Sequence, residues 1–198
     1  MPSPSPIVRH SMSQRRDLDR AAVVAAAAAI SDADGFDTLT LAAVAQRLGI
    51  RTPSLYNHVS SLADLRSAVA IAGRHALAAT MGTAAQGRSA DDAVRAIAQA
   101  FRAFAKDHPG LYAAMYRVPD GDDPERRAAA WEIIQVVLNV LTAYGLEGDA
   151  AIHTVRVIQS MVYGFVALEV GGAFGMPLDI DESFDLLLTL MLRGLRPS

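Results

Sequence analysis

The sequence predicts an all-α protein of about nine helices. Apolar residues recur at the i, i+3 and i+4 spacing of buried helix faces, and glycine, proline or polar residues separate these segments. No alternation of apolar and polar residues, which would indicate a strand, extends beyond a few positions. Hydrophobic residues make up 52% and charged residues 20% of the 198 residues. This composition favours folded helices over disorder, and the length allows a sizeable core.

The front of the chain is expected to contain two short helices joined by a tight turn, within residues 40–59. In the first of these helices, Val44, Ala45 and Leu48 share one face. Gly49 follows where a helix stop requires a positive φ, and Ile50 supplies the apolar contact that accompanies such a stop. The small Ala45 allows a close crossing with the next helix. Together these features predict a helix-turn-helix.

The second helix of the pair is expected to begin with Thr52 as its N-cap. Pro53 suits the first turn, where no backbone N–H is needed. Leu55 and Val59 lie four residues apart and are expected to be buried. The other side chains of this helix then point away from the core, as in a recognition helix that enters the major groove of DNA.

Further helices are expected on both sides of this motif. Residues 17–34 form the first, which ends at Gly35. Ser61 and Asp64 form a capping-box-like start for a helix that runs to about residue 80. A glycine-containing segment over residues 82–89 marks a candidate domain boundary. The rear half is predicted to form helices over residues 90–106, 111–117, 125–144, 150–173 and 180–195.

Charge is distributed unevenly along the chain. The formal net charge is −3. The first 75 residues carry eight arginines against six acidic residues, a balance of +2. The rest of the chain carries ten basic and fifteen acidic residues, a balance of −5. This asymmetry indicates a DNA-facing front and an acidic rear.

Several features of the sequence bear on the cellular compartment of the protein. The chain has no cysteine, so disulfides and thiolate metal sites are excluded. No apolar run reaches about 18 residues, so no membrane span is expected. Residues 1–16 lack the apolar core of a signal peptide, and their proline and serine content predicts a disordered arm. We therefore expect a soluble, cytoplasmic protein.

The sequence resembles a known family. Residues 17–77 are similar to the N-terminal domain of TetR-family transcriptional regulators, and the run AVAQRLGI-x-x-P-S-LY-x-HV is highly specific to that family. Residues 78–198 are similar to one subgroup of its C-terminal ligand-binding domains, through HPGLYAAMY and VYGFVALEVGGAFG. The resemblance implies a homodimer formed mainly by the last two long helices and a small-molecule pocket in each rear domain. It also implies repression of a promoter that is relieved when a ligand binds.

The resemblance implies which residues contact a double-stranded DNA operator. Serine and threonine donate to bases or phosphates, proline packs on a thymine methyl group, and tyrosine or histidine reaches phosphate oxygens. Asn57 would read adenine or bond the DNA backbone. Tyr56 would contact phosphate or, alternatively, pack under the first helix. The implied contacts are Thr40, Arg51, Thr52, Pro53, Ser54, Tyr56, Asn57 and His58.

The charges of this region depart from the family pattern. Ala42 stands where relatives often have arginine, and Ser60 and Leu62 stand where lysines are frequent. DNA binding is therefore expected to depend less on salt, because that dependence follows the number of neutralised phosphates. Three arginines of the N-terminal arm are expected to compensate from a minor groove. They are Arg9, Arg15 and Arg16.

The rear half supplies the mixture of aromatic residues, methionine and a few polar groups that lines small-molecule sites. The same residues also suit a protein core, and both interpretations remain open at this point. For Glu169 the alternatives are an acid on an exposed helix edge and a buried anchor for a ligand or a neighbouring helix. The candidate pocket residues are Phe101, Phe104, Tyr112, Met115, Tyr116, Trp131, Gln135, Gln159, Tyr163 and Glu169.

Glycines on one face of the helix at residues 150–173 predict the close approach of another helix. Glycine in a helix interior costs about 1 kcal/mol relative to alanine, and close packing offsets that cost. With apolar residues of the last helix, this face is expected to form a four-helix dimer interface. The alternative is packing of the same helices within one chain. The candidate residues are Gly164, Gly171, Gly172, Leu186, Leu187, Leu190 and Met191.

The sequence therefore predicts a ligand-responsive, dimeric DNA-binding regulator, and we expect a repressor that a small-molecule effector releases from a palindromic operator. The alternative is a helical small-molecule-binding protein with weak or no specific DNA binding. An enzyme is not expected, because no nucleophile elbow or phosphate-binding glycine motif is present. The five histidines share no helical pairing that would suit a metal ion. We expect neither a cofactor nor a metal site.

Overall fold

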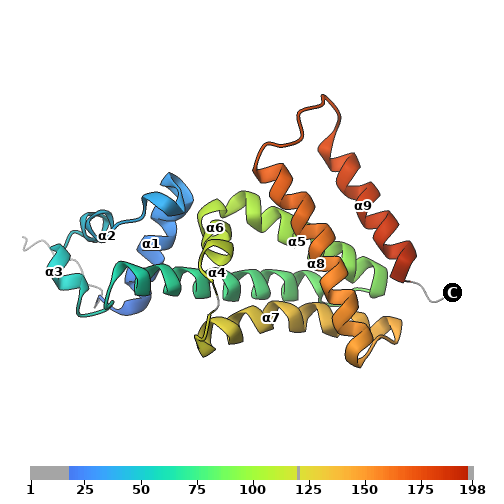
Figure 1. Ribbon diagram of the computed structural model, residues 1–198, viewed down its shortest axis with the longest axis horizontal. Coiled ribbons are helices and arrows are strands. Elements are labelled where there is room, and N and C mark those ends of the chain that lie inside the picture. Colours follow the sequence, from blue (N-terminus) through green and yellow to red (C-terminus); the bar gives the residue numbers. More distant parts are fainter. Residues whose placement is uncertain (1–17, 120, 196–198) are drawn as a thin grey trace, which may run out of the picture.

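The computed structural model describes residues 18–119 and 121–195, so the predicted arm with its three arginines lies outside the described residues. The described part consists of helices and connections without a strand, and the predicted all-α class is confirmed (Figure 1). The α-helices are α1 Arg20–Asp34, α2 Leu41–Leu48, α3 Thr52–Leu55, α4 Leu62–Ala85, α5 Ala90–Asp107, α6 Pro109–Arg117, α7 Pro124–Leu141, α8 Gly148–Val170 and α9 Ile180–Leu195, with short 3₁₀ helices at Phe36–Thr38 and Thr142–Tyr144.

Helices α1, α2 and α3 gather at one end of the molecule (Figure 1). The predicted stop after α2 is confirmed: Gly49 has a φ of 67°, and the N–H of Ile50 donates to the carbonyl oxygen of Ala45 at 3.0 Å. Leu55 of α3 is fully buried against this unit. The predicted helix-turn-helix is therefore present.

The predicted cap of the recognition helix is wrong. Arg51 occupies the N-cap position without a side-chain cap bond, and Thr52 is already the first helical residue. Pro53 lies in the first turn as expected. Helix α3 closes after four residues, and the chain continues through a turn to the buried Val59.

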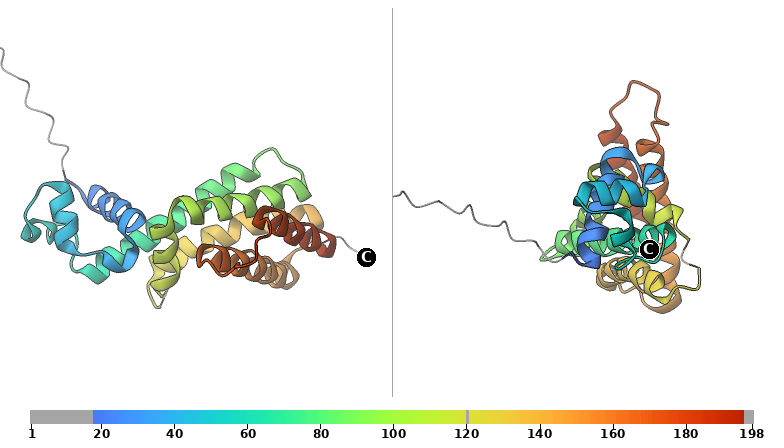
Figure 2. Two further views of the ribbon diagram at one scale, coloured as in Figure 1. Left: turned by 90° about the horizontal axis from the view of Figure 1, so that it is seen from above. Right: turned by 90° about the vertical axis from the view of Figure 1, so that its left-hand side faces the viewer.

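Helix α4 runs from this unit into the rear of the molecule. Its predicted start is confirmed, because the hydroxyl of Ser61 accepts the N–H of Asp64 at 3.0 Å. It continues to Ala85, beyond the expected end near residue 80 and across the expected boundary between residues 77 and 78. The left view of Figure 2 shows α1 to α3 at one end of the long axis and α9 toward the other, with α4 reaching into both regions.

Helix α6 lies between the two halves and begins earlier than predicted. Pro109 is its first residue, because proline needs no N–H there, and Gly110 belongs to its first turn. A Cβ atom on Gly110 would overlap the carbonyl group of Ser31 at the end of α1. On the other side, a Cβ on Gly73 of α4 would lie 3.1 Å from Cγ of Met115. Two glycines thus permit close packing of α6 against both α1 and α4.

The predicted continuation of α8 through a pair of glycines is wrong. The helix ends at Val170, and Gly172 has a φ of 68°, a left-handed conformation that glycine adopts without steric cost. The N–H of Ala173 then donates to the carbonyl oxygen of Leu168 at 2.9 Å, which closes the last turn. These glycines therefore end the helix and do not lie on its face.

Helix α8 is long and apolar, although the sequence leads us to expect no membrane span. By length and composition it meets the description of such a span, with a mean hydropathy of 1.3, and 28% of its most apolar window is buried within the chain. One side of the helix contributes Val155, Ile158 and Val162 to the core. The other side leaves Val157 and Leu168 exposed. An apolar helix of this kind also suits an interface with another protein chain.

Glu169 is an anchor between helices, with 9% of its side chain exposed, and is not an acid on an exposed edge. Both carboxylate oxygens accept hydrogen bonds from the guanidinium of Arg102 on α5, each at 2.6 Å. Arg102 also pairs with Asp181 of α9 at 2.7 Å and lies 4.8 Å above the ring centre of Phe184. The Arg102 hydrogen bonds lower the pKa of Glu169. This junction ties α5, α8 and α9 together.

Candidate DNA interface and effector cavity

The predicted DNA contacts share the outer face of the helix-turn-helix. Leu55 and Val59 turn inward, so the side chains between and before them face outward. Tyr56 has 57% of its surface exposed, and its ring therefore does not pack beneath α1. The structure leaves Thr40, Arg51, Pro53, Ser54, Tyr56 and Asn57 exposed and Thr52 and His58 partly exposed.

The cationic side chains near this face are few. Arg20 pairs with Asp64, and Arg66 donates to the carbonyl oxygens of Asp37 and Leu39, so both serve the fold. Within the described residues 18–75, Arg47 and Arg51 are the exposed arginines whose side chains form no such hydrogen bond or ion pair. The surface next to α3 thus offers mainly neutral hydrogen-bonding groups.

A hydrogen-bonded brace fixes the corner that follows α3. Arg20 of α1 donates to both carboxylate oxygens of Asp64, at 2.6 and 3.1 Å, and to the carbonyl oxygen of His58 at 2.8 Å. Asp64 also accepts the N–H of Ser60 at 2.7 Å. These bonds, chiefly the one from Arg20, lower the pKa of Asp64 to about 2. Sequence reasoning missed Arg20, because its partner lies 44 residues away.

A cavity of about 360 Å³ lies among α4, α5, α6, α7 and α8. Its size falls within the range of small-molecule sites. Five of the predicted pocket residues line it, namely Phe101, Met115, Tyr116, Gln159 and Tyr163. The prediction missed most of the aliphatic wall and one arginine, namely Arg74, Met81, Ile97, Ala98, Val118, Pro119, Ala130, Ile133, Ile134, Val137, Val155, Ile158 and Val162.

Five predicted pocket residues lie outside the lining. Phe104 is buried beside His108, with the ring centres 4.9 Å apart. Trp131 is exposed on α7, Gln135 is half-buried, and Glu169 belongs to the junction with Arg102. Composition could not separate these positions from the lining, because a core and a pocket recruit the same residue types. The α8 positions 155, 158, 159, 162 and 163 do show the helical spacing that could have located the wall.

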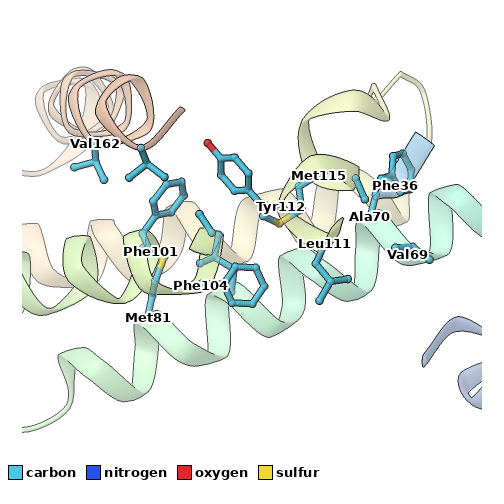
Figure 3. Packing of buried hydrophobic residues seen from close by; sticks show 14 of the residues in the cluster. Phe36, Val69, Ala70, Met81, Phe101, Phe104, Leu111, Tyr112, Met115 and Val162 are labelled. Carbon is cyan, nitrogen blue, oxygen red and sulfur yellow. The ribbon is translucent and has the colours of Figure 1, made fainter. Parts of the chain in front are cut away.

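Tyr112 lies immediately behind the cavity wall. Its ring centre is 5.0 Å from that of Tyr116 and 6.3 Å from that of Tyr163. Only 8% of the residue is exposed, and among the described residues its hydroxyl has no hydrogen-bond partner. Burial raises the pKa of this phenol. In Figure 3 the hydroxyl points away from α4 and toward the side on which Val162 of α8 lies.

Helix α6 connects the cavity to the helix-turn-helix unit. Its side supplies Met115 and Tyr116 to the cavity wall. At its start, one carboxylate oxygen of Asp32 accepts the N–H groups of Gly110 and Leu111 at 2.8 and 2.9 Å. At its end, Arg117 forms an ion pair with Asp37. A displacement of this wall would therefore be transmitted directly to α1 and the segment after it.

The candidate dimer residues fall into three groups. Leu186 and Leu190 of α9 expose 59% and 54% of their surfaces, and Leu187 and Gly164 are half-buried. Met191 is buried within the chain and presents no surface to a partner. The two remaining candidates, Gly171 and Gly172, lie in the exposed connection between α8 and α9. This connection and the helix ends beside it also expose Leu168, Val170, Phe174, Met176 and Leu178.

The described residues contain no cluster of three histidine, aspartate or glutamate side chains placed to hold a metal ion.

Residues 94–191 match a family model described as a tetracyclin repressor-like C-terminal domain. Over 182 residues the chain is 41% identical to an uncharacterised HTH-type transcriptional regulator of Mycobacterium tuberculosis, which covers 91% of this chain and 83% of that protein.

Solved structures share the fold. A protein of unknown function from Rhodococcus superposes with a TM-score of 0.80 at 23% identity, over 93% of this chain and all of the other. The TetR-family protein ActR of Streptomyces coelicolor, in complex with (S)-DNPA, superposes with a TM-score of 0.64 at 20% identity, over 90% of this chain and 96% of the other. The 41% identity to a helix-turn-helix regulator, together with the matching rear half, shows that the chain belongs to the TetR family of transcriptional regulators.

Proposed function

We propose that this chain acts as a homodimeric repressor that binds a near-palindromic operator and releases it when a small-molecule effector enters the rear cavity. The observation that carries the proposal is the position of α6, which lines the cavity with Tyr116 and bonds α1 through Asp32. Residues 17–77 act as the DNA-binding domain, and residues 78–198 bind the effector and form the dimer. The protein has no catalytic role and works in the cytoplasm.

Helix α3 enters the major groove in this proposal. Its outward side chains read bases and bond phosphates through neutral donors and acceptors, while Arg47 and Arg51 supply charge. The brace of Arg20 and Asp64 supports this assignment, because it holds the corner after α3 in one geometry. Two copies of α3 about 34–36 Å apart would contact half-sites one helical turn apart.

The second copy of the chain covers the exposed apolar face of α8 and α9. Leu186 and Leu190 lie one turn apart on α9, and Leu168 and Val170 end the exposed side of α8. Several large apolar side chains exposed on two neighbouring helices suit an interaction surface. Covering it with the same surface of a second copy also removes the apolar side of α8 from water without a membrane. No membrane therefore takes part.

Effector binding acts by shifting the balance between two arrangements of the dimer. A ligand changes that balance only if it binds one arrangement more tightly than the other. Helix α6 can provide this difference in affinity between the two arrangements. Its side lines the cavity, while Gly110 at its start lies against the backbone of α1. A ligand that moves α6 must therefore move α1 or break these contacts, and the distance between the two recognition helices changes.

A selection from random DNA duplexes with the full-length protein tests the DNA-binding part of the proposal. Recovery of a near-palindrome supports it, and retention of DNA without any sequence preference contradicts it. The recovered site is then tested with Asn57→Ala, which we expect to weaken binding about tenfold through loss of base or backbone bonds. Gln99→Ala, on the exposed side of α5, serves as the control and should leave the affinity unchanged.

A further inference from the structure

The two ends of the cavity differ in the polarity of their lining side chains, and this difference indicates the chemistry of the effector. The inference rests on the proposed function, since it concerns the same cavity. Helices α4 and α7 run side by side in the same direction (Figure 1). Two contacts fix their alignment: Arg74 donates to the carbonyl oxygen of Arg126 at 3.4 Å, and Gly82 lies opposite Val136. Positions along either helix therefore measure depth along the cavity.

Three of the four polar lining side chains lie at the α6 end. Arg74 donates to the carbonyl oxygen of Met115 on α6 at 2.7 Å and has only 6% of its surface exposed. Tyr116 of α6 and Tyr163 of α8 meet there, with ring centres 4.4 Å apart. Gln159 lies on α8 one turn before Tyr163, halfway toward Val155. All four of these side chains line the cavity.

The opposite end is apolar. Met81 lies seven residues beyond Arg74 on α4, and Val155 lies eight residues before Tyr163 on α8. At about 1.5 Å per helical residue, each separation corresponds to roughly 10–12 Å. Ile97 and Val137 complete this end. The cavity is thus about as long as a ten-carbon chain, with three of its four polar side chains near α6.

The polar end contains one group that can only donate. A guanidinium only donates, whereas the phenols and the amide of Gln159 can each donate or accept. Tyr112, whose hydroxyl is buried and unpartnered, lies against the rings of Tyr116 and Tyr163. Because Tyr112 lies behind the wall, the lining side chains carry the assignment. The fixed positive charge of Arg74, which can only donate, favours an acceptor as the ligand group at this end.

We propose that the effector is an elongated apolar molecule with an oxygen acceptor as its head group, bound with the head at α6 and the apolar body between α4, α7 and α8. The head contacts Tyr116 and Tyr163 beside Arg74. The body extends toward Met81 and Val155. The head group thus occupies the end of the cavity that contacts the DNA-binding domain through α6.

Calorimetry with the full-length protein and without DNA tests this assignment. The probes are decanoate, 2-undecanone and decylammonium. We expect the two oxygen-headed probes to bind, and decylammonium to bind at least tenfold more weakly, because a cation has no acceptor and is repelled by Arg74. From hexanoate to decanoate, each methylene should strengthen binding about fourfold, as apolar burial predicts. Equal or tighter binding of decylammonium would overturn the proposal.

Substitutions test the orientation of the ligand. Tyr116→Phe and Tyr163→Phe should each weaken decanoate binding about two- to tenfold, the effect of one lost hydrogen bond. Tyr144→Phe removes a phenol that bonds Asp91 outside the cavity lining; it is the matched control and should leave decanoate binding unchanged. Val155→Phe fills the apolar end and should move the optimum from decanoate to a shorter acid. Circular dichroism checks the fold of each variant; should Val155→Phe not fold, the two tyrosine variants still decide the question.

The outcomes separate this inference from the proposed function. A palindrome recovered from random DNA, with no binding of either oxygen-headed probe, would refute the ligand assignment and leave the regulator intact. Probe binding with the expected head-group preference, but no sequence preference for DNA, would support the ligand assignment and contradict the regulator. Unchanged decanoate affinity in both tyrosine variants would refute the placement of the head.

Discussion

Gly110 holds the first turn of α6 directly against the end of α1. A side chain at this position would overlap the carbonyl group of Ser31, which belongs to the backbone and cannot rotate away. The N–H of the same glycine donates to Asp32, so the close approach and the hydrogen bond depend on one another. The packing between the two halves of the chain therefore depends on the absence of a single methyl group.

Replacing Gly110 with alanine should destabilise the protein by about 1–3 kcal/mol, the usual cost of overpacking. Urea unfolding followed by circular dichroism measures the change. The control is Gly82→Ala in α4, where the nearest atom to the added Cβ, in Val136, lies 3.9 Å away. That substitution should leave the stability unchanged or raise it by up to about 1 kcal/mol. Equal effects of the two substitutions would contradict the packing described here.

Residue-level predictions succeeded for two local signals, Gly49 and Ser61, and failed for a third, the cap at Thr52. Gly49 stops α2 and Ser61 caps α4 as expected, because caps and left-handed stops depend on neighbouring residues and on backbone φ. The roles of Gly110 and Glu169 depend on partners far along the chain, and no spacing rule reveals these partners. The same applies to Tyr112, which was expected in the lining and lies one layer behind it.

At the scale of elements, the corner between α3 and α4 depends on one ion pair. Arg20 holds the pKa of Asp64 at about 2, below the ordinary value near 4 for aspartate. The charged carboxylate is favoured in the folded state. Asp64 therefore contributes stability above about pH 4, and this contribution declines as the pH falls from about 4 toward 2. Because Arg20 is half exposed, we expect only about 1 kcal/mol after screening.

Arg20→Met should therefore lower the stability at pH 7 by about 1 kcal/mol and flatten the decline between pH 4 and pH 2. Thermal unfolding across that pH range measures both effects. Arg47→Met removes an exposed arginine from α2 and serves as the control; its pH profile should match that of the unchanged protein. A pH profile of Arg20→Met that also matches would show that the brace does not set the titration of Asp64.

Helix positions were largely predictable, and the relations between helices were not. The spacing of apolar residues locates α5 and α9 almost to the residue, because an amphipathic helix displays its buried face along the sequence. The spacing of apolar residues does not show where α6 begins, although Pro109 at its first position is a local start signal. The role of Gly110 in the first turn depends on the backbone of α1, which lies directly against it. The cavity likewise depends on five helices, none of which encloses it alone.

At the scale of the whole molecule, the apolar face of α8 and α9 is expected to join two copies of the chain. Replacing both Leu186 and Leu190 with lysine places two like charges on this face and should yield a monomer at micromolar concentration. Sedimentation velocity measures the change in mass. Operator affinity should fall at least a hundredfold, because a monomer contacts one half-site.

Trp131→Lys is the control for the dimer test. It exchanges an exposed aromatic residue of α7 for the same charge, away from the leucines of α9. This variant should sediment as the unchanged protein does. A dimer that persists after both leucine substitutions would place the interface on another surface.

Helix α4 makes the two halves of the chain one thermodynamic unit. Its N-cap is Ser61, next to the recognition helix, and it ends at Ala85 behind the cavity. If one half of the chain unfolds, the other half therefore loses part of this central helix. The chain should therefore melt in one cooperative transition. A ligand that binds only the folded rear then raises the melting temperature of the recognition helix as well, by mass action. The DNA-binding end is protected from unfolding by a molecule that touches none of its residues.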